Sequence, residues 1–484
     1  MIQFINPFRL RIYTYLVLFF SFLPLWAQQS NTLFFMHSLP ESNLVNPAIQ
    51  IETGLFIGLP IISSIHVNVA SNAFNAFESI YTDTLGRPRI KLNFDRNKLQ
   101  NYNYCLSEAH ITLFAAGYRY GDYYFSFNIT EKNNQAFIYT DDLATLYQEN
   151  SSSFRAQWID IYPSGIFSNH LREYNLGISR SFSSNLIIGA KVKLLFGKLN
   201  FETYNNQLYL YSLEESNDIL FDMRLGLNSS MPYSIHTGSS GDYHYYNRYN
   251  TSAAGILMNR SNPGAAIDLG LIYKRSENLT FSASILDLGF IKYRSNLTNY
   301  SLSGHYFYQG DWGKYPAEDS LVTKVFNELN DNISDSLSYD PYIHTLDPRA
   351  YFGISYKLTN TSNLNFLLYS RFFSNHIQTG GTLSYQAKIF RNLNTSISWS
   401  YMNNSLSNFG IGIDYRNDPI QLYLVSDNIL GVFMPYQFNN TNLRFGINIH
   451  FGLISNQNIK SGWGLKERQK YRKLRKGKNV NNFE

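Results

Sequence analysis

Apolar and polar residues alternate with a period of two along most of the chain between residues 56 and 452. Clear examples are YYFSFNI at residues 123–129, AIDLGLIY at 266–273 and LRFGINIHF at 443–451. Successive side chains of a β-strand point to opposite faces, so each run has one apolar face and one face of mostly Ser, Asn, Asp, Gly, Arg or His. The pattern predicts an all-β protein built from paired antiparallel strands.

The connections between these runs differ strongly in length. Short polar turns of Asn, Asp, Gly and Ser, which supply the backbone geometry of tight hairpins, lie at residues 121–122, 183–185, 276–278, 360–363, 391–392 and 417–419. Long polar connections lie at residues 71–100, 140–172, 230–264 and 310–349. Short periplasmic turns and long outer loops are typical of bacterial outer-membrane barrels, in which strand numbers are even. We therefore expect a transmembrane antiparallel β-barrel of about 14–16 strands with long extracellular loops.

Composition supports a membrane location without helical spans. Charged residues make up only 15% of the chain, against about a quarter in soluble domains, and aromatic residues make up 16%. The mean hydropathy is −0.25, too low for many helices of about 20 apolar residues each. A barrel accommodates such a mean value because only one face of each strand is apolar. Cys105 is the only cysteine, so no intramolecular disulfide is possible.

The N-terminus has the features of an export signal. Arg9 and Arg11 precede an apolar stretch at residues 13–23, and Ala27 offers a small-residue cleavage site. An uncleaved anchor helix is the alternative, but the apolar stretch is shorter than a bilayer requires. We expect a signal peptide at 1–27, an N-terminal lumen or plug segment at 28–55, an outer-membrane barrel at 56–454 and a basic periplasmic tail at 455–484.

The net charge of +5 is concentrated in that tail. A solvated tail is the simplest interpretation, and a contact with anionic lipid headgroups or an acidic partner is the functional one. The candidate contact residues are Lys466, Arg468, Lys470, Arg472, Lys473, Arg475, Lys476 and Lys478.

Two stretches within the long connections have helical spacing, at residues 141–147 and 317–329. A short surface helix capping a loop is the simpler interpretation of each, and a partner-docking helix is the other.

No known catalytic motif occurs in the sequence. It contains no HExxH, GxSxG, P-loop or GxGxxG pattern, and no His or Asp pair has the usual spacing of metal ligands. Strand histidines such as His66, His110, His376 and His450 are interpreted as structural lumen residues. The aromatic residues alternate along strands while the basic residues cluster in the tail, which is unlike a nucleic-acid-binding surface. We expect no enzyme activity, no cofactor and no nucleic-acid partner.

Several short motifs resemble a known family. They are NTLFFMHSLPESNLVNPA at 31–48, FIGLP at 56–60, Ser63 with Ser64, LDLGFI at 286–291 and SDNIL at 426–430. Together they resemble a Bacteroidetes outer-membrane barrel family of unknown function, which is similar to the long-chain fatty-acid transporter superfamily. That superfamily includes a shuttle-type component of type IX secretion. The basic tail departs from the usual barrel end at an aromatic residue, for which Phe451 is the nearest candidate.

The resemblance implies a barrel of about 14 strands whose N-terminal segment folds into the lumen. Asn46, Pro47 and Ala48 would lie in that segment. Pro47 and its polar neighbours make a poor strand, and irregular backbone at membrane depth must be satisfied inside the barrel.

Two functions remain open at this stage. One is a channel or transporter for small hydrophobic solutes. The other is a partner-binding scaffold linked to envelope or type IX secretion machinery. A barrel hydrolase and a secreted all-β adhesin are alternatives from other classes. The expected partners are outer-membrane lipid, a hydrophobic small molecule and other envelope or secretion proteins, and the expected location is the bacterial outer membrane.

Overall fold

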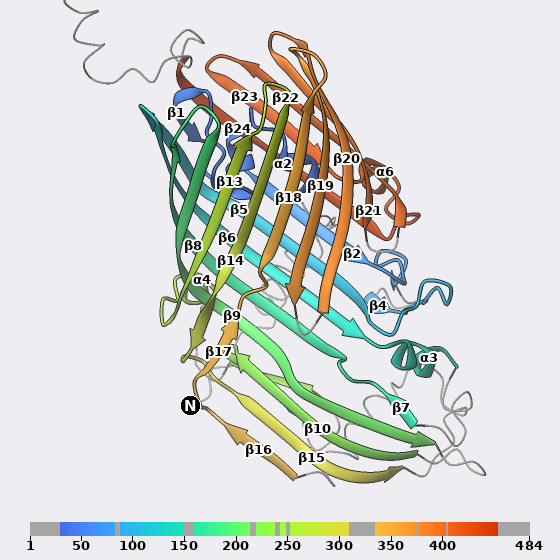
Figure 1. The fold of residues 1–484 in the computed structure, drawn as a ribbon. Coiled ribbons are helices and arrows are strands. Elements are labelled where there is room, and N and C mark those ends of the chain that lie inside the picture. Colours follow the sequence, from blue (N-terminus) through green and yellow to red (C-terminus); the bar gives the residue numbers. More distant parts are fainter. Residues whose placement is uncertain are drawn as a thin grey trace, which may run out of the picture.

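A closed antiparallel barrel of 14 strand positions forms the body of the protein (Figure 1). The computed structural model describes residues 30–82, 88–149, 158–212, 219–237, 243–247, 252–308, 334–373, 376–402 and 405–453. The expected fold class and the lower of the two expected strand numbers are confirmed.

Every barrel position pairs with two neighbours, so the sheet has no open edge in the membrane. The first position is shared by β1 (Thr53–Gly58) and β2 (Ile65–Ser71), which both pair with the last strand and with the next one. The following positions are β5 (Asn103–Tyr120), β6 (Tyr123–Tyr139), β8 (Gly165–Ser181), β9 (Leu186–Ser212), β13 (Asn262–Lys274), β14 (Leu279–Tyr293), β18 (Arg349–Lys357), β19 (Ser362–Phe373), β20 (His376–Phe390), β21 (Leu393–Met402), β22 (Ser405–Asn417), β23 (Ile420–Ser426) and β24 (Asn440–Leu453).

All six predicted short turns are confirmed, and they lie at one end of the barrel, between β5 and β6, β8 and β9, β13 and β14, β18 and β19, β20 and β21, and β22 and β23. At the other end the connections carry further elements. These are β3 (Ile80–Thr82), β4 (Pro88–Ile90), α3 (Asp141–Glu149), β7 (Trp158–Asp160), β11 (Tyr233–Thr237), β12 (Tyr243–Asn247), α4 (Ala253–Leu257) and α6 (Ile429–Phe433). Helix α3 confirms the first helical prediction, whereas residues 317–329 lie outside the described part of the chain.

Several strands continue well beyond the expected boundaries. Residues 165–172, expected in a loop, belong to β8, and β9 runs for 27 residues. Beyond the barrel, β9 pairs with β10 (Ile219–Ser230), followed by β15 (Asn299–Tyr308) and β16 (Ser334–Ser338). The alternation was missed at 165–172 because His170 and Arg172, which bond Glu131 at 2.8 and 2.5 Å, replace apolar side chains on the outer face.

The outer wall is apolar around the whole circumference. Each barrel position or its connection contributes a large exposed apolar side chain, including Ile62, Tyr118, Phe125, Leu176, Val192, Leu269, Leu288, Phe352, Leu368, Leu383, Ile397, Phe409, Leu422 and Phe445. Side chains that alternate with them point inward and are largely Ser, Asn, Asp and Gln. A continuous apolar belt of this kind faces lipid, so the protein is a bacterial outer-membrane barrel and not a released adhesin.

None of the described helices is long and apolar enough to cross a bilayer.

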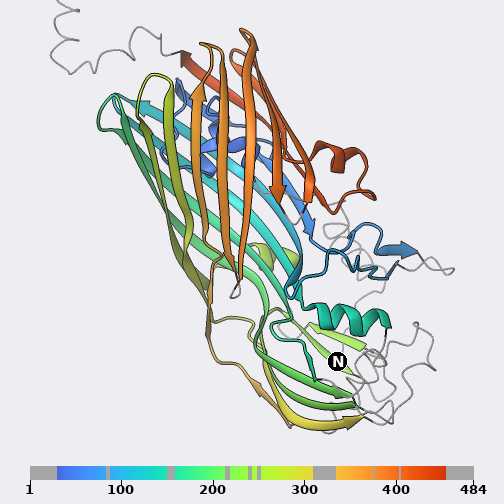
Figure 2. The ribbon, with the colours of Figure 1, turned by 45° about the vertical axis from the view of Figure 1, so that its right-hand side comes forward.

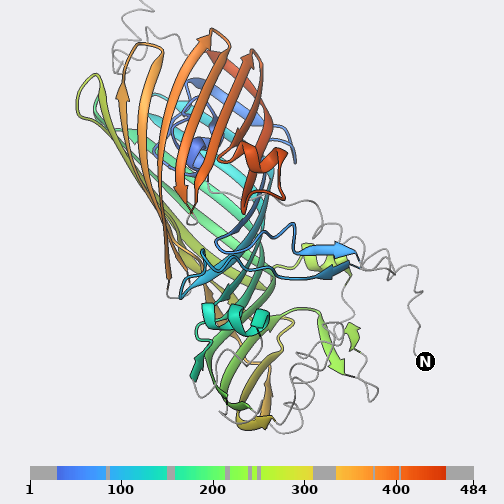
Figure 3. The same cartoon turned by 90° about the vertical axis from the view of Figure 1, so that its right-hand side faces the viewer.

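The N-terminal segment from Ser30 to Ile51 lies inside the barrel, nearer the end with the short turns (Figure 2). It contains α2 (Asn31–Phe34) and the 3-10 helix η1 (Pro40–Leu44), both visible through the wall in Figure 3. The first barrel strand then begins at Thr53, slightly before the expected boundary, and the last ends at Leu453. We call residues 30–51 the plug.

A charge placed in the lipid-facing belt tests this orientation. Ile397 lies mid-strand in β21 and is 63% exposed, whereas its neighbours Ser396 and Ser398 are buried in the lumen. Ile397→Arg should reduce the free energy of unfolding by about 2–4 kcal/mol, because an arginine at the bilayer midplane is poorly solvated. Urea titration of the protein in lipid vesicles measures the free energy of unfolding, with Ile397→Val as the control. An Ile397→Arg protein as stable as the control would contradict the assignment.

Candidate functional site

The start of the plug is held by a carboxylate at the end of β23. Asp427 accepts hydrogen bonds from the backbone N–H groups of Asn31, at 3.1 Å, and Thr32, at 2.6 Å. The side chain of Asn442 donates to the same carboxylate at 3.1 Å. The first N–H groups of a helical turn have no partner within the helix, and a carboxylate satisfies them well. Asp427 thereby ties the first turn of the plug to the wall.

Asn46, Pro47 and Ala48 lie against β9 and β13 inside the barrel. The side-chain oxygen of Asn46 accepts from the backbone N–H of Ala48 at 3.0 Å, which closes a local turn. The Pro47 and Ala48 backbone approaches Gly189 and Gly270 so closely that a Cβ atom at either glycine would overlap it. The two glycines therefore create the space that this part of the plug occupies.

Wall side chains also satisfy the carbonyl groups of the plug. Lys191 donates to the carbonyl of Asn43 at 2.5 Å, and Ser284 donates to the carbonyl of Val45 at 2.6 Å. Gln421 donates to the carbonyl of Ser38 at 3.1 Å. Irregular backbone is stable at membrane depth only when such partners exist.

An apolar cluster fills the space between the plug and one side of the wall. Phe34 of the plug stacks on Tyr351 of β18, with ring centroids 5.4 Å apart. The cluster comprises Leu33, Phe34, Phe35, Met36, Leu39, Val45, Leu286, Tyr351, Leu367, Tyr369, Tyr423 and Val425. The plug is thus packed like a protein core as well as hydrogen-bonded.

A cavity of about 210 Å³ lies on the extracellular side of the plug. Along β9 the plug contacts come at Gly189 and Lys191, whereas residues 200–202, further from the periplasmic turn, line the cavity. Lys132 also lines it, directly beside Glu131, where the outer face of β6 becomes charged. The cavity, which we call the chamber, therefore lies near the outer edge of the lipid-facing belt.

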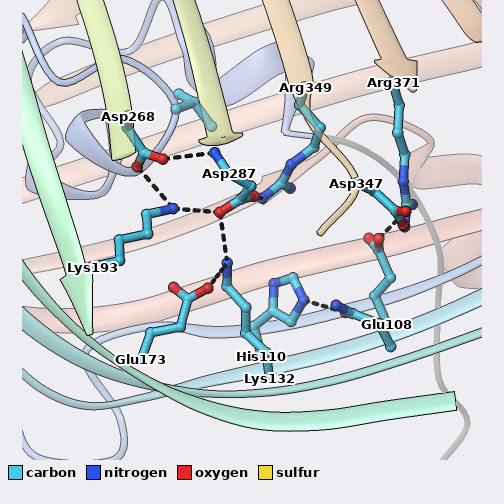
Figure 4. Close-up of polar contacts among 12 residues, drawn as sticks. Glu108, His110, Lys132, Glu173, Lys193, Asp268, Asp287, Asp347, Arg349 and Arg371 are labelled. Atoms are coloured by element: carbon cyan, nitrogen blue, oxygen red, sulfur yellow. Dashed lines mark hydrogen bonds and ion pairs between the residues drawn. The ribbon is translucent and has the colours of Figure 1, made fainter. Parts of the chain in front are cut away.

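Asp287 is the hub of an ion-pair network beside the chamber (Figure 4). Its carboxylate pairs with Lys193 and Arg349, and with Lys132 at 3.7 Å. Lys193 also contacts Asp268 at 2.8 Å, and Lys132 contacts Glu173 at 2.7 Å. These residues come from β6, β8, β9, β13, β14 and β18, so the network links a large part of the wall across the lumen.

A local irregularity of the backbone turns Asp287 inward. The ladder of β14 is interrupted here, because β14 pairs with β18 up to Leu286 and with β17 (Tyr342–Thr345) only from Phe290 onward. Asp287 has a φ of 62°, in the left-handed region that Asp and Asn tolerate better than most residues. Its N–H group donates to Asp268 at 2.7 Å. The irregularity lets two successive side chains, Leu286 and Asp287, both be buried.

A second group of charges completes the polar side of the chamber. Arg371 pairs with Glu108 at 2.7 Å and with Asp347 at 2.8 Å. Two histidines also line the chamber: His110 bonds Asn134 at 2.8 Å and His344 bonds Glu202. The remaining lining includes apolar side chains, namely Ala136, Phe167, Leu171, Phe201, Ile343 and Leu346. The chamber is therefore amphipathic.

The candidate residues named from the sequence are not the ones that form this charged network. The basic tail from Lys466 to Lys478 lies beyond the described residues. His66, His110 and His450 are buried in the barrel, and His376 begins β20. Asp287 and Asp427 were noticed only as parts of family-like motifs, and the charged partners of Asp287 were missed because they are far apart in the chain. Across the described part of the chain, no group of three or more His, Cys, Asp or Glu side chains is arranged to hold a metal ion.

The model of a protein family described as a family of unknown function, DUF5723, matches residues 47–427. The protein belongs to the DUF5723 family. A comparison of this DUF5723 chain with curated protein sequences finds no match. Its expected links to Bacteroidetes and to type IX secretion stay predictions.

Solved structures similar to this DUF5723 barrel include those of three bacterial proteins. The Pseudomonas putida toluene transporter TodX is 11% identical with a TM-score of 0.36, and the match covers 84% of this chain and 93% of TodX. The Ralstonia pickettii toluene transporter TbuX is 11% identical with a TM-score of 0.40, covering 85% and 94%. A Pseudomonas aeruginosa FadL homologue is 10% identical with a TM-score of 0.37, covering 89% and 100%. The toluene in two of these descriptions is the substrate of those proteins.

Removing the Asp427 carboxylate should loosen the plug of the DUF5723 barrel. Hydrogen bonds to charged groups contribute about 1.5–3 kcal/mol each, and Asp427→Ala loses two to the plug backbone. We expect larger or more frequent conductance steps in planar bilayers. Asp418→Ala is the control, because Asp418 lies in a periplasmic turn and is 45% exposed. Conductance equal to that of the control would show that Asp427 does not hold the plug.

Neutralising Asp287 should destabilise the barrel by about 3–5 kcal/mol, because it takes the carboxylate partner from Arg349 and removes one of two partners from Lys132 and Lys193. Asparagine also tolerates a positive φ, so Asp287→Asn isolates the effect of charge. Thermal unfolding followed by electrophoretic mobility measures the loss, with Asp222→Asn at an exposed pair with His305 as the control. Adding Arg349→Met should restore part of the stability, because it removes the cation that loses its carboxylate partner, and equal loss in the single and double variants would refute the coupling.

Proposed function

We propose that this DUF5723 protein takes up a small amphipathic solute, which binds in the chamber above the plug and crosses the outer membrane when the plug yields. The observation that carries this proposal is the lining of the chamber. Charged residues such as Lys132 and Arg349 share it with apolar residues such as Phe167 and Leu171. A solute with a polar head and an apolar body matches such a lining, whereas a purely apolar one leaves the charges without water.

The size of the chamber limits what enters it. Pockets for drug-sized ligands have volumes of about 300–1,000 Å³, so a cavity of about 210 Å³ takes a head group or a short solute. Two apolar clusters adjoin it: one around Leu106 and Ile138, which includes the lining residue Ala136, and one around Leu195 and Tyr293, which includes the lining residue Leu171. Phe167 and Phe201 of the lining are only partly buried and offer contact surface for the apolar part of the solute.

A solute can pass through the lumen only when the plug moves. It fills the lumen between the chamber and the short-turn end, and it is held by hydrogen bonds and packing rather than by covalent links. Hydrogen bonds of this kind exchange for bonds to water or ligand at modest net cost. The arrangement therefore suits a gate that opens for a bound solute.

A partner-binding scaffold is the second candidate, favoured by the sheet beyond the membrane. A tilted strand crosses a bilayer in about 9–11 residues, so the 27-residue β9 extends far past it. It carries β10, β15 and β16 as an outer sheet (Figure 1). The β2–β5 connection packs Phe74 and Phe94 against Tyr139 as a separate small core. A folded platform of this size is suited to contact other proteins.

Purification from native membranes in mild detergent, with mass spectrometry of bound lipids and proteins, tests the two functions together. We expect a bound amphiphile that is reduced severalfold in Phe167→Ala, because Phe167 lines the chamber. Phe182→Ala is the matched control, since Phe182 lies beyond β8 at the periplasmic turn and is 56% exposed. A stoichiometric protein partner without any bound amphiphile would reject solute uptake and support the scaffold.

A further inference from the structure

The chamber presents both signs of charge side by side. Its lining contains five carboxylates and three Lys or Arg side chains, namely Glu108, Glu173, Glu202, Asp287, Asp347, Lys132, Arg349 and Arg371. Each of these cations pairs with at least one of these carboxylates. A ligand that enters must therefore compete with ion pairs that already exist.

The charge balance decides which head group competes best. An anionic head can pair only with a cation of the lining and a cationic head only with a carboxylate, so each gains ionic contacts of one kind. An unpaired charge in a partly buried site is strongly unfavourable. A zwitterionic head can pair with a carboxylate and a cation at once, and the displaced partners keep other contacts, because Arg371 stays with Glu108 and Asp287 stays with Lys132 and Lys193. The paired lining thus favours a zwitterion over either single charge.

One ion pair in the chamber is placed for such an exchange. The Asp347 side chain is 37% exposed, whereas its partner Arg371 is 6% exposed and keeps a second partner, Glu108. Asp347 lies between β17 and β18, and Arg349, two residues further on, is 21% exposed. In Figure 4, Asp347 lies beside Arg371, and Arg349 reaches Asp287. The lining therefore offers an accessible carboxylate and, two residues further along the chain, a partly accessible guanidinium.

We infer that the chamber selects solutes with a zwitterionic head, whose ammonium group binds Asp347 and whose anionic group binds Arg349. The inference rests on the proposed uptake of an amphipathic solute and names the class of that solute. Arg371 stays neutralised by Glu108 when Asp347 turns to the ligand. Asp347 and Arg349 are thereby the residues that determine specificity.

Three probes with the same dodecyl chain separate the charge types: dodecyl betaine, dodecanoate and dodecyltrimethylammonium. Calorimetric titration of the full-length protein in amphipol, below the micellar concentration of each probe, measures their affinities. We expect the betaine to bind at least about tenfold more tightly than either single-charge probe, since each of those probes lacks one of the two ion pairs that the betaine forms. Equal or tighter binding of dodecanoate or of the cation overturns the inference.

Two variants test the assigned roles. Asp347→Asn should weaken betaine binding about tenfold while leaving dodecanoate binding equal or stronger, and Arg349→Gln should weaken both probes that carry a carboxylate. Asp340→Asn, at an exposed position on the other side of β17, is the matched control and should change none of the affinities. A betaine affinity unchanged in Asp347→Asn contradicts the role of Asp347.

Arg349 also pairs with Asp287, so the Arg349→Gln substitution could affect folding. The thermal unfolding of this variant is therefore measured as well, to confirm that its barrel is folded. If dodecanoate binds and the betaine does not, the inference of a zwitterionic head is wrong, whereas the proposed uptake of an amphipathic solute is still supported. If none of the three probes binds the folded wild-type protein, both proposals fail.

Discussion

Backbone N–H and C=O groups find no partner in hydrocarbon, and the whole architecture depends on meeting this constraint. The sheet meets it by closing on itself, with β24 paired to β1 and β2, which in turn pair with β5. Closure with 14 strand positions leaves a lumen that must be filled or solvated. The plug fills one part of it, and its own irregular backbone is satisfied by Lys191, Ser284, Gln421 and Asp427. The same constraint thus explains the barrel and the polar contacts of the plug.

The charged layer follows from the position of the lumen within the membrane. Buried charges are tolerated where partners of the opposite sign surround them. Asp287 collects three cations from neighbouring positions, and Arg371 is held by two carboxylates. The chamber lies where the outer wall changes from apolar to charged at Glu131. Water from outside is therefore close to this layer, which makes its exposed member, Asp347, available for exchange.

Plug and chamber are mechanically connected through shared strands. On β9, Lys191 binds the plug and Lys193 binds Asp287, two residues apart on the same inner face. On β14, Ser284 binds the plug and Asp287 lies in the network. On β18, Tyr351 packs on Phe34 while Arg349 faces the chamber. A ligand that rearranges the chamber ion pairs therefore acts on strands that also hold the plug. This proximity is the physical link between solute binding and opening in the proposed function.

The sequence by itself determined the strand pattern, the short turns and the membrane-facing character of the barrel. These depend on side-chain alternation and turn residues, which are local properties of a few consecutive positions. Only the tertiary structure decided that Lys132, Lys193 and Arg349 meet at Asp287, because strand order and register bring them together from distant parts of the chain. It also decided that Asp287 points inward, since an interrupted ladder and a left-handed backbone at one residue leave no mark on the alternation. The extension of β8 past its expected start was hidden for a related reason: above the membrane the outer face becomes polar, and the period-two signal disappears while the hydrogen-bonded ladder continues.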